Sequence, residues 1–102
     1  MATAPEFVLM KKIKRYLDAV PDLWWFKKHG GQFGPAGIPD IIICYGGRFI
    51  AFEGKRVGRA PTPLQESTMR KIQAAGGHAS AAYTLEEIQA VIEPLRKLQS
   101  DC

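Results

Sequence analysis

Two acidic residues and a lysine stand at a spacing that a β-hairpin would bring together. Asp40 precedes one apolar run, and Glu53 and Lys55 end a second run, with Gly46 and Gly47 between the two. A glycine pair flanked by β-branched and aromatic residues is typical of a tight hairpin turn. In that register Asp40 lies opposite Glu53, with Cβ atoms roughly 4.5–5.5 Å apart. Lys55 shares their face, because side chains along a strand alternate between the two faces.

Two carboxylates placed opposite each other repel, so this register calls for a cation. Carboxylate oxygens suit a hard ion such as Mg²⁺ or Mn²⁺, and the carbonyl of Gly54 is a possible third ligand. Such an ion polarises a water and neutralises charge on a phosphate, while Lys55 could orient the water or stabilise the developing anion. The alternative is structural: Asp40 is then a turn acid after proline, and Glu53 and Lys55 are a solvated strand end. No cysteine or histidine spacing typical of zinc occurs.

The elements that must position these residues follow from apolar periodicity and from turn signals. A cap at Thr62 with proline after it begins one helix, and a capping box at 84–87 begins another. The expected order is α-β-β-β-α-β-α, with helices at 5–20, 63–75 and 85–98 and strands at 23–28, within the 38–53 hairpin and at 78–83.

The hairpin is apolar on both faces, which predicts a sheet covered by helices on both sides. Asp40, Glu53 and Lys55 then lie at the rim of a buried sheet, where each charge needs a partner. Trp24 and Trp25 are expected in the core or at a subunit interface rather than as platforms for stacking bases.

Composition limits the possible classes of protein. The 102 residues carry a net charge of +4, which allows either attraction to a polyanion such as nucleic acid or an ordinary solvated surface. The length predicts one domain, over residues 1–102. No apolar run is long enough to cross a bilayer. Cys44 and Cys102 make no disulfide framework, so a reducing, cytoplasmic setting is expected.

Four segments together resemble the virus-type replication-repair nuclease (VRR-NUC) domain of the PD-(D/E)xK nuclease superfamily. The resemblance covers nearly the whole chain and implies a restriction-endonuclease-like α/β core with a mixed sheet flanked by helices. The segments are GIPD at 37–40, FIAFEGK at 49–55, TPLQ at 62–65 and AGG at 75–77.

The resemblance also implies roles for individual residues. Asp40 and Glu53 match the metal-binding acids, and Lys55 matches the catalytic lysine. Gln65 matches a glutamine on the helix behind the site, and Glu6 matches the acid of the first helix. One residue departs from the pattern, because position 54 is more often branched and apolar in the family and is glycine here.

The expected activity is Mg²⁺- or Mn²⁺-dependent endonucleolytic cleavage of DNA, without an organic cofactor and away from membranes. Single-domain members of the family are similar to Holliday-junction resolvases, which favours four-way junctions in DNA repair and a homodimer with two active sites. Basic residues beside the loops are candidates for holding phosphates: Lys27, Lys28, Arg56 and Arg59. The alternatives are a flap, nicking or restriction-like endonuclease, a DNA-binding module that does not cut, and an interaction protein with structural salt bridges.

Overall fold

The structure is a computed structural model that describes residues 5–28, 37–55 and 57–100, with side chains from Leu9 onward. The helices and strands follow the predicted order α-β-β-β-α-β-α. They are α1 (Pro5–Ala19), β1 (Trp24–Lys27), β2 (Ile41–Tyr45), β3 (Arg48–Gly54), α2 (Pro63–Ala74), β4 (His78–Ala82) and α3 (Leu85–Ser100).

The four strands form one mixed sheet in the order β1-β2-β3-β4. β1, β2 and β3 are antiparallel neighbours, whereas β4 lies parallel to β3 because α2 carries the chain back across the sheet. Tyr45 pairs with Arg48 and Ile41 with Phe52, which is the register predicted from the sequence. Gly46 and Gly47 have φ values of 60° and 77°, the paired left-handed conformations of a mirror-image hairpin turn.

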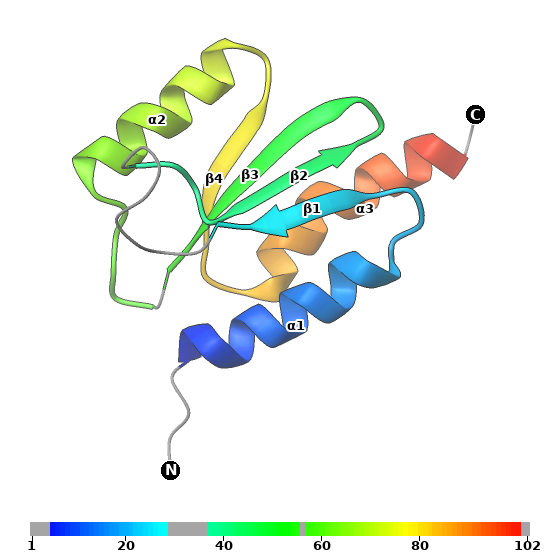
Figure 1. Cartoon of the computed structure of the whole chain (residues 1–102), viewed down its shortest axis with the longest axis horizontal. Coiled ribbons are helices and arrows are strands. Elements are labelled where there is room, and N and C mark those ends of the chain that lie inside the picture. The colour runs from blue at the N-terminus through cyan, green and yellow to red at the C-terminus, as the bar shows by residue number, and fades with distance from the viewer. Residues whose placement is uncertain (1–4, 29–36, 56, 101–102) are drawn as a thin grey trace.

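α1 and α3 pack together on one face of the sheet (Figure 1). Tyr16 of α1 donates a hydrogen bond to Glu93 of α3, which joins the two helices at their surface. Beneath them lies the larger hydrophobic core, which contains Ile13, Leu17, Val20, Ile41, Ile43, Tyr45, Ile50, Phe52, Ala82, Ile88 and Ile92.

α2 covers part of the opposite face, chiefly beside β4 (Figure 1), and the cluster beneath it extends to Ile42 of β2. Met69 of α2 packs there on Ala51 and Ala79 in a second, smaller cluster. Helices flank both faces of the sheet, as predicted, but among the described residues none covers the turn end of the hairpin on the α2 side, where Cys44 and Phe49 are exposed, or Trp24 beside it. The prediction that both faces of the hairpin are covered is wrong for that end, because one helix is too narrow to cover four strands.

Both predicted helix caps are present. The Thr62 hydroxyl accepts a hydrogen bond from the Gln65 N–H at 3.1 Å, and the Gln65 side-chain oxygen accepts one from the Thr62 N–H at 2.8 Å. Thr84 and Glu87 exchange the same pair of bonds at the start of α3. Reciprocal bonds of this kind satisfy N–H groups that lack partners within the helix, so they fix where α2 and α3 begin.

In the described part of the chain, none of the three helices combines the length and the apolar character needed to cross a membrane.

Candidate active site

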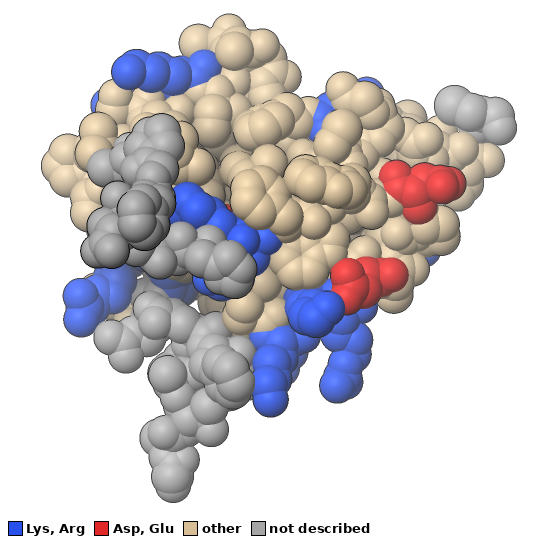
Figure 2. Space-filling view, in the orientation of Figure 1, with Lys and Arg blue, Asp and Glu red and all other residues tan. Residues whose placement is uncertain are grey.

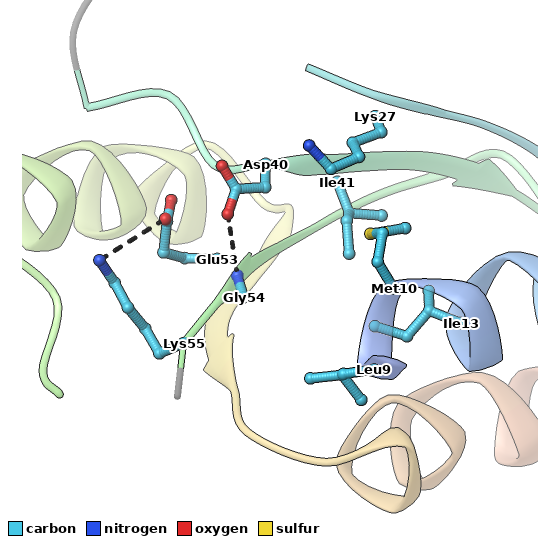
Figure 3. Close-up of a pocket in the computed structure, with 9 residues that line it drawn as sticks. All are labelled: Leu9, Met10, Ile13, Lys27, Asp40, Ile41, Glu53, Gly54 and Lys55. Atoms are coloured by element: carbon cyan, nitrogen blue, oxygen red, sulfur yellow. Dashed lines mark hydrogen bonds and ion pairs between the residues drawn. The ribbon is translucent and has the colours of Figure 1, made fainter. Parts of the chain in front are cut away.

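The two acids meet at the edge of the sheet where β2 begins and β3 ends. Asp40 immediately precedes β2, and one of its carboxylate oxygens, Oδ2, accepts a hydrogen bond from the N–H of Gly54 at 3.3 Å. The carbonyl of Asp40 accepts a second bond from the N–H of Lys28 at 2.6 Å. Figure 3 shows the carboxylates of Asp40 and Glu53 side by side. The backbone of two neighbouring strands therefore holds Asp40 beside Glu53.

Glu53 is the one charged residue that is buried among those described, with 4% of its surface exposed. Its oxygen Oε2 lies 3.8 Å from the ammonium of Lys55 and accepts a hydrogen bond from the Gln65 side chain at 3.2 Å. Its other oxygen, Oε1, is buried and has no hydrogen-bond partner in the described structure. Leaving a buried acceptor unpaired costs free energy, about 1–3 kcal/mol and more for a charged group, so this oxygen indicates a missing ligand.

The pKa of Glu53 is raised to about 7, chiefly by burial and then by the nearby negative charge of Asp40, while the positive charges of Lys55 and Lys28 oppose the shift. Near neutral pH the pair therefore holds a proton for part of the time. A cation bound between the acids would take the place of that proton.

The donor set fits a hard divalent cation. Within the described ranges no three His, Cys, Asp or Glu residues come together, so a cation here would rely on Asp40, Glu53 and a backbone carbonyl. Mg²⁺ and Mn²⁺ suit that arrangement, because they are bound through few carboxylates and take further ligands from water and phosphate. A side chain added at Gly54 would meet only the Asp40 carboxylate, at 3.7 Å, so the site also has room for a larger residue there.

A cavity of about 320 Å³ opens beside the acids. One wall is polar and comes from Lys27, Asp40, Glu53, Gly54 and Lys55 (Figure 3). The opposite wall is apolar and includes Leu9 and Met10 of α1. Converging charged groups on one side of a cavity and an apolar wall on the other are typical of a ligand site.

The predicted phosphate-binding residues and Glu6 fall into three groups. Lys27 lines the cavity, and the charge of Lys28 acts on Glu53, so the end of β1 contributes cations to the site. Arg59 is exposed and does not line the cavity, and its carbonyl accepts a hydrogen bond from Tyr83 at 2.7 Å. Arg56 and the side chain of Glu6 lie outside the described residues, although the backbone of Glu6 belongs to α1.

The apolar wall was not predicted from the sequence. Leu9 and Met10 pack partly against the main core, as their place in an amphipathic helix suggests. Only the position of α1 beside the end of β3 puts these two side chains at the cavity as well. Helical periodicity carries the signal for their burial but none for their distance from the acids.

Gln65 links the start of α2 to Glu53. Its side-chain oxygen accepts from the Thr62 N–H, so its side-chain nitrogen is left to donate to Glu53. The helix cap thus decides which end of the amide points toward the buried carboxylate. That orientation holds Glu53 and supplies a donor without adding charge.

Gln65→Glu tests this arrangement. A glutamate can still accept from the Thr62 N–H, but it presents a carboxylate instead of a donor to Glu53. We expect DNA cleavage to fall by about 10- to 100-fold, as for other partners of metal-ligating groups. The matched control is Glu87→Gln, which changes the equivalent residue of the α3 cap, whose hydrogen bonds go to Tyr83 and Thr84 rather than to the acids. Equal cleavage rates for the two variants would show that Gln65 serves only the helix.

Two solved structures share this arrangement of a mixed sheet and three helices. One, described as "VRR_NUC domain", superposes with a TM-score of 0.72 at 19% identity, over 89% of this chain and 97% of that chain. The other, a "VRR_NUC domain protein", gives a TM-score of 0.71 at 18% identity, over 92% of this chain and 89% of that chain. No protein-family model and no curated protein matches the sequence.

The structure therefore defines an α/β protein with a mixed sheet and paired acids at one edge. More narrowly, the chain has the fold of VRR_NUC domains, which confirms the resemblance seen in the sequence at the level of architecture.

Proposed function

We propose that this chain, as a single nuclease domain over residues 1–102, is a metal-dependent endonuclease of the PD-(D/E)xK type that hydrolyses DNA phosphodiester bonds. The observation that carries the proposal is the unpaired, buried Oε1 of Glu53 beside Asp40 and Lys55. A buried carboxylate oxygen without a hydrogen-bond partner is costly in a merely structural role, whereas a metal site explains it. The likeness to VRR_NUC structures supports the same conclusion.

In this proposal Asp40, Glu53 and the carbonyl of Gly54 hold Mg²⁺ or Mn²⁺. The ion supplies Lewis-acid polarisation and neutralises charge on the phosphate. Lys55 donates hydrogen bonds that orient the attacking water or stabilise the developing anion. Gln65 keeps Glu53 in position through its amide N–H. Glu6, in the first helix, is assigned as a further acid of the site.

The basic residues hold the DNA backbone on either side of these acids. Lys27 and Lys28 end β1 beside Asp40, where an ammonium can neutralise a phosphate next to the scissile one. Arg56 and Arg59 follow β3 and would contact the backbone on the other side. Phosphate contacts of this kind fix the register of the DNA but do not read its sequence.

The substrate we propose is a four-way DNA junction, cut by a homodimer. One copy of the chain presents one pair of acids, so cutting two strands at symmetric positions needs two copies related by a twofold axis. With DNA as substrate and an exposed free thiol at Cys44, the working compartment would be intracellular and reducing.

A panel of DNA substrates tests both the activity and the preference. The purified chain is incubated with a four-way junction, a flap, a nicked duplex and a linear duplex, each with Mn²⁺, with Mg²⁺ or with chelator. We expect metal-dependent cutting, fastest on the junction and at symmetric positions in opposite strands. Equal rates on all substrates would remove the junction preference, and no cutting with either metal would remove the nuclease assignment.

A further inference from the structure

Two aromatic side chains stand exposed in a row on the edge strand β1. Trp24 is 59% exposed and Phe26 is 46% exposed, and their ring centroids lie 5.6 Å apart at an interplanar angle of 45°. Trp25, between them, is half-buried against the core and donates a hydrogen bond to Asp18 at 2.9 Å. Trp24 therefore does not lie in the core, the first of the two places expected for it, whereas Trp25 does pack there.

This row leads directly to the candidate active site. Alternation along the strand puts Trp24 and Phe26 on the same face as Lys28, the next residue but one. The N–H of Lys28 donates to the carbonyl of Asp40, so the row ends beside the acids. Figure 2 shows an uncharged surface over β1 and the hairpin, with Lys and Arg side chains at one end of it.

Exposed aromatic rings on a sheet are a common way to bind unpaired bases. RNA-binding sheets stack successive bases on such rings, and proteins that bind single strands combine stacking platforms with cations that hold the backbone. Trp24 and Phe26 supply two adjacent rings here, and Lys28 with Lys27 supplies the cations. If one phosphate of a DNA strand lies at the acids and the strand continues along β1, its next phosphates lie at the lysines and its next bases lie at the aromatic rings.

A second copy of the chain fits this row less well. The lysines lie at the end of the row rather than opposite acids, so a second copy laid on this row would gain no charge pairing from them. The same charges attract a polyanion. Continuity with the acid-lined cavity therefore favours a nucleic-acid strand over a protein surface.

We propose that Trp24 and Phe26 stack unpaired bases of the DNA strand that is cut at Asp40 and Glu53. The inference rests on the proposed function for the identity of the ligand. It adds that the substrate has unpaired nucleotides next to the scissile phosphate, on the side of β1. Branched DNA, whose bases can open at the branch point, meets this requirement more readily than a continuous duplex.

Binding rather than cleavage tests the proposal, in the Asp40→Asn background so that the DNA stays intact. Fluorescence anisotropy measures the affinity for labelled oligothymidylate and for a blunt duplex of equal length. Trp24→Leu and Phe26→Leu remove a ring but keep apolar bulk, and each should weaken oligothymidylate binding by about 5- to 100-fold. Trp24→Phe and Phe26→Tyr keep a ring and should bind nearly normally, and duplex affinity should not change.

Phe49→Leu is the matched control. Phe49 is 45% exposed on the same face but lies on β3, away from the row, so its loss should leave oligothymidylate binding unchanged. Tryptophan fluorescence gives a second readout in case a leucine variant folds poorly. Bound oligothymidylate should quench the emission of the parent protein, and Trp24→Phe should lose that quenching while its affinity is kept.

Three outcomes would overturn the stacking role. In the first, both leucine variants bind oligothymidylate as the parent protein does and have its mass. In the second, the variants lose affinity for the duplex and for oligothymidylate equally. In the third, the variants keep their affinity but sediment in analytical ultracentrifugation with a smaller mass than the parent protein. The last would make the row an interface between copies of the chain. Failure of the nuclease assignment is distinguishable, because it appears as absent cleavage by the parent protein whatever Trp24 and Phe26 do in binding.

Discussion

Asp40→Asn is expected to lower DNA cleavage by about 10²- to 10⁴-fold while DNA binding stays equal or becomes tighter. Asparagine keeps the shape of the side chain and an oxygen for the Gly54 N–H, which lies 3.3 Å from the Asp40 carboxylate. It removes the negative charge that would hold a divalent cation, whose stabilisation of phosphate charge amounts to several kcal/mol. It also removes one charge that repels DNA. Single-turnover cleavage and anisotropy measure the two effects separately.

Asp22→Asn is the matched control for this experiment. Asp22 is exposed, lies in the turn after α1 and has a φ of 62°, a left-handed conformation that asparagine also adopts readily. The control should cut at the parent rate. If Asp40→Asn also cut at the parent rate, the acid pair would have no part in the chemistry and the proposed function would be withdrawn.

The second large effect is a dependence of stability on pH and metal that runs through Glu53. Without metal, the pKa of Glu53 is about 7 in the folded chain, above its ordinary value of 4.5. Its contribution to stability is therefore full below pH 4.5 and is lost as the pH rises through 7. The loss reaches at most about 3 kcal/mol, which corresponds to a fall in Tm on the order of 10 °C. Mn²⁺ should restore the Tm at pH 8 and have little effect at pH 5.

Glu53→Gln should flatten both responses, because glutamine neither ionises nor binds the cation well. Thermal unfolding by circular dichroism, at a series of pH values with chelator or with Mn²⁺, measures the Tm. The matched control is Glu86→Gln, which replaces an exposed acid in the first turn of α3. In this variant the Tm should still depend on pH and should still rise with Mn²⁺ at pH 8. A parent Tm that stays constant between pH 5 and 8 in chelator would contradict the raised pKa.

Local sequence signals predicted the parts of the site that depend on neighbouring residues. The glycine pair sets the hairpin register and strand side chains alternate between the two faces, so the placement of Asp40 beside Glu53 follows from the sequence. The cap at Thr62 likewise needs only residues within one turn of α2. These signals work because turn geometry, alternation and capping act over a few residues of chain.

Longer-range features of the site needed the tertiary structure. Gln65 reaches Glu53 only because α2 crosses the sheet behind β3, and the burial of Glu53 depends on the same packing. That burial leaves Oε1 without a partner and raises the pKa. Neither effect can be read from the identity of the residue, since most glutamates at strand ends are solvated.

The sequence by itself determined the order of the elements, the hairpin register and the three charged residues at its rim. Only the tertiary structure decided that α2 covers half of its face of the sheet and that α1 supplies an apolar wall beside the acids. An apolar residue in a strand is expected to pack against another apolar surface. The position of each helix decides whether a helix covers that residue or leaves it exposed to solvent. For this reason the sequence did not show that Trp24 and Phe26 are exposed in the fold.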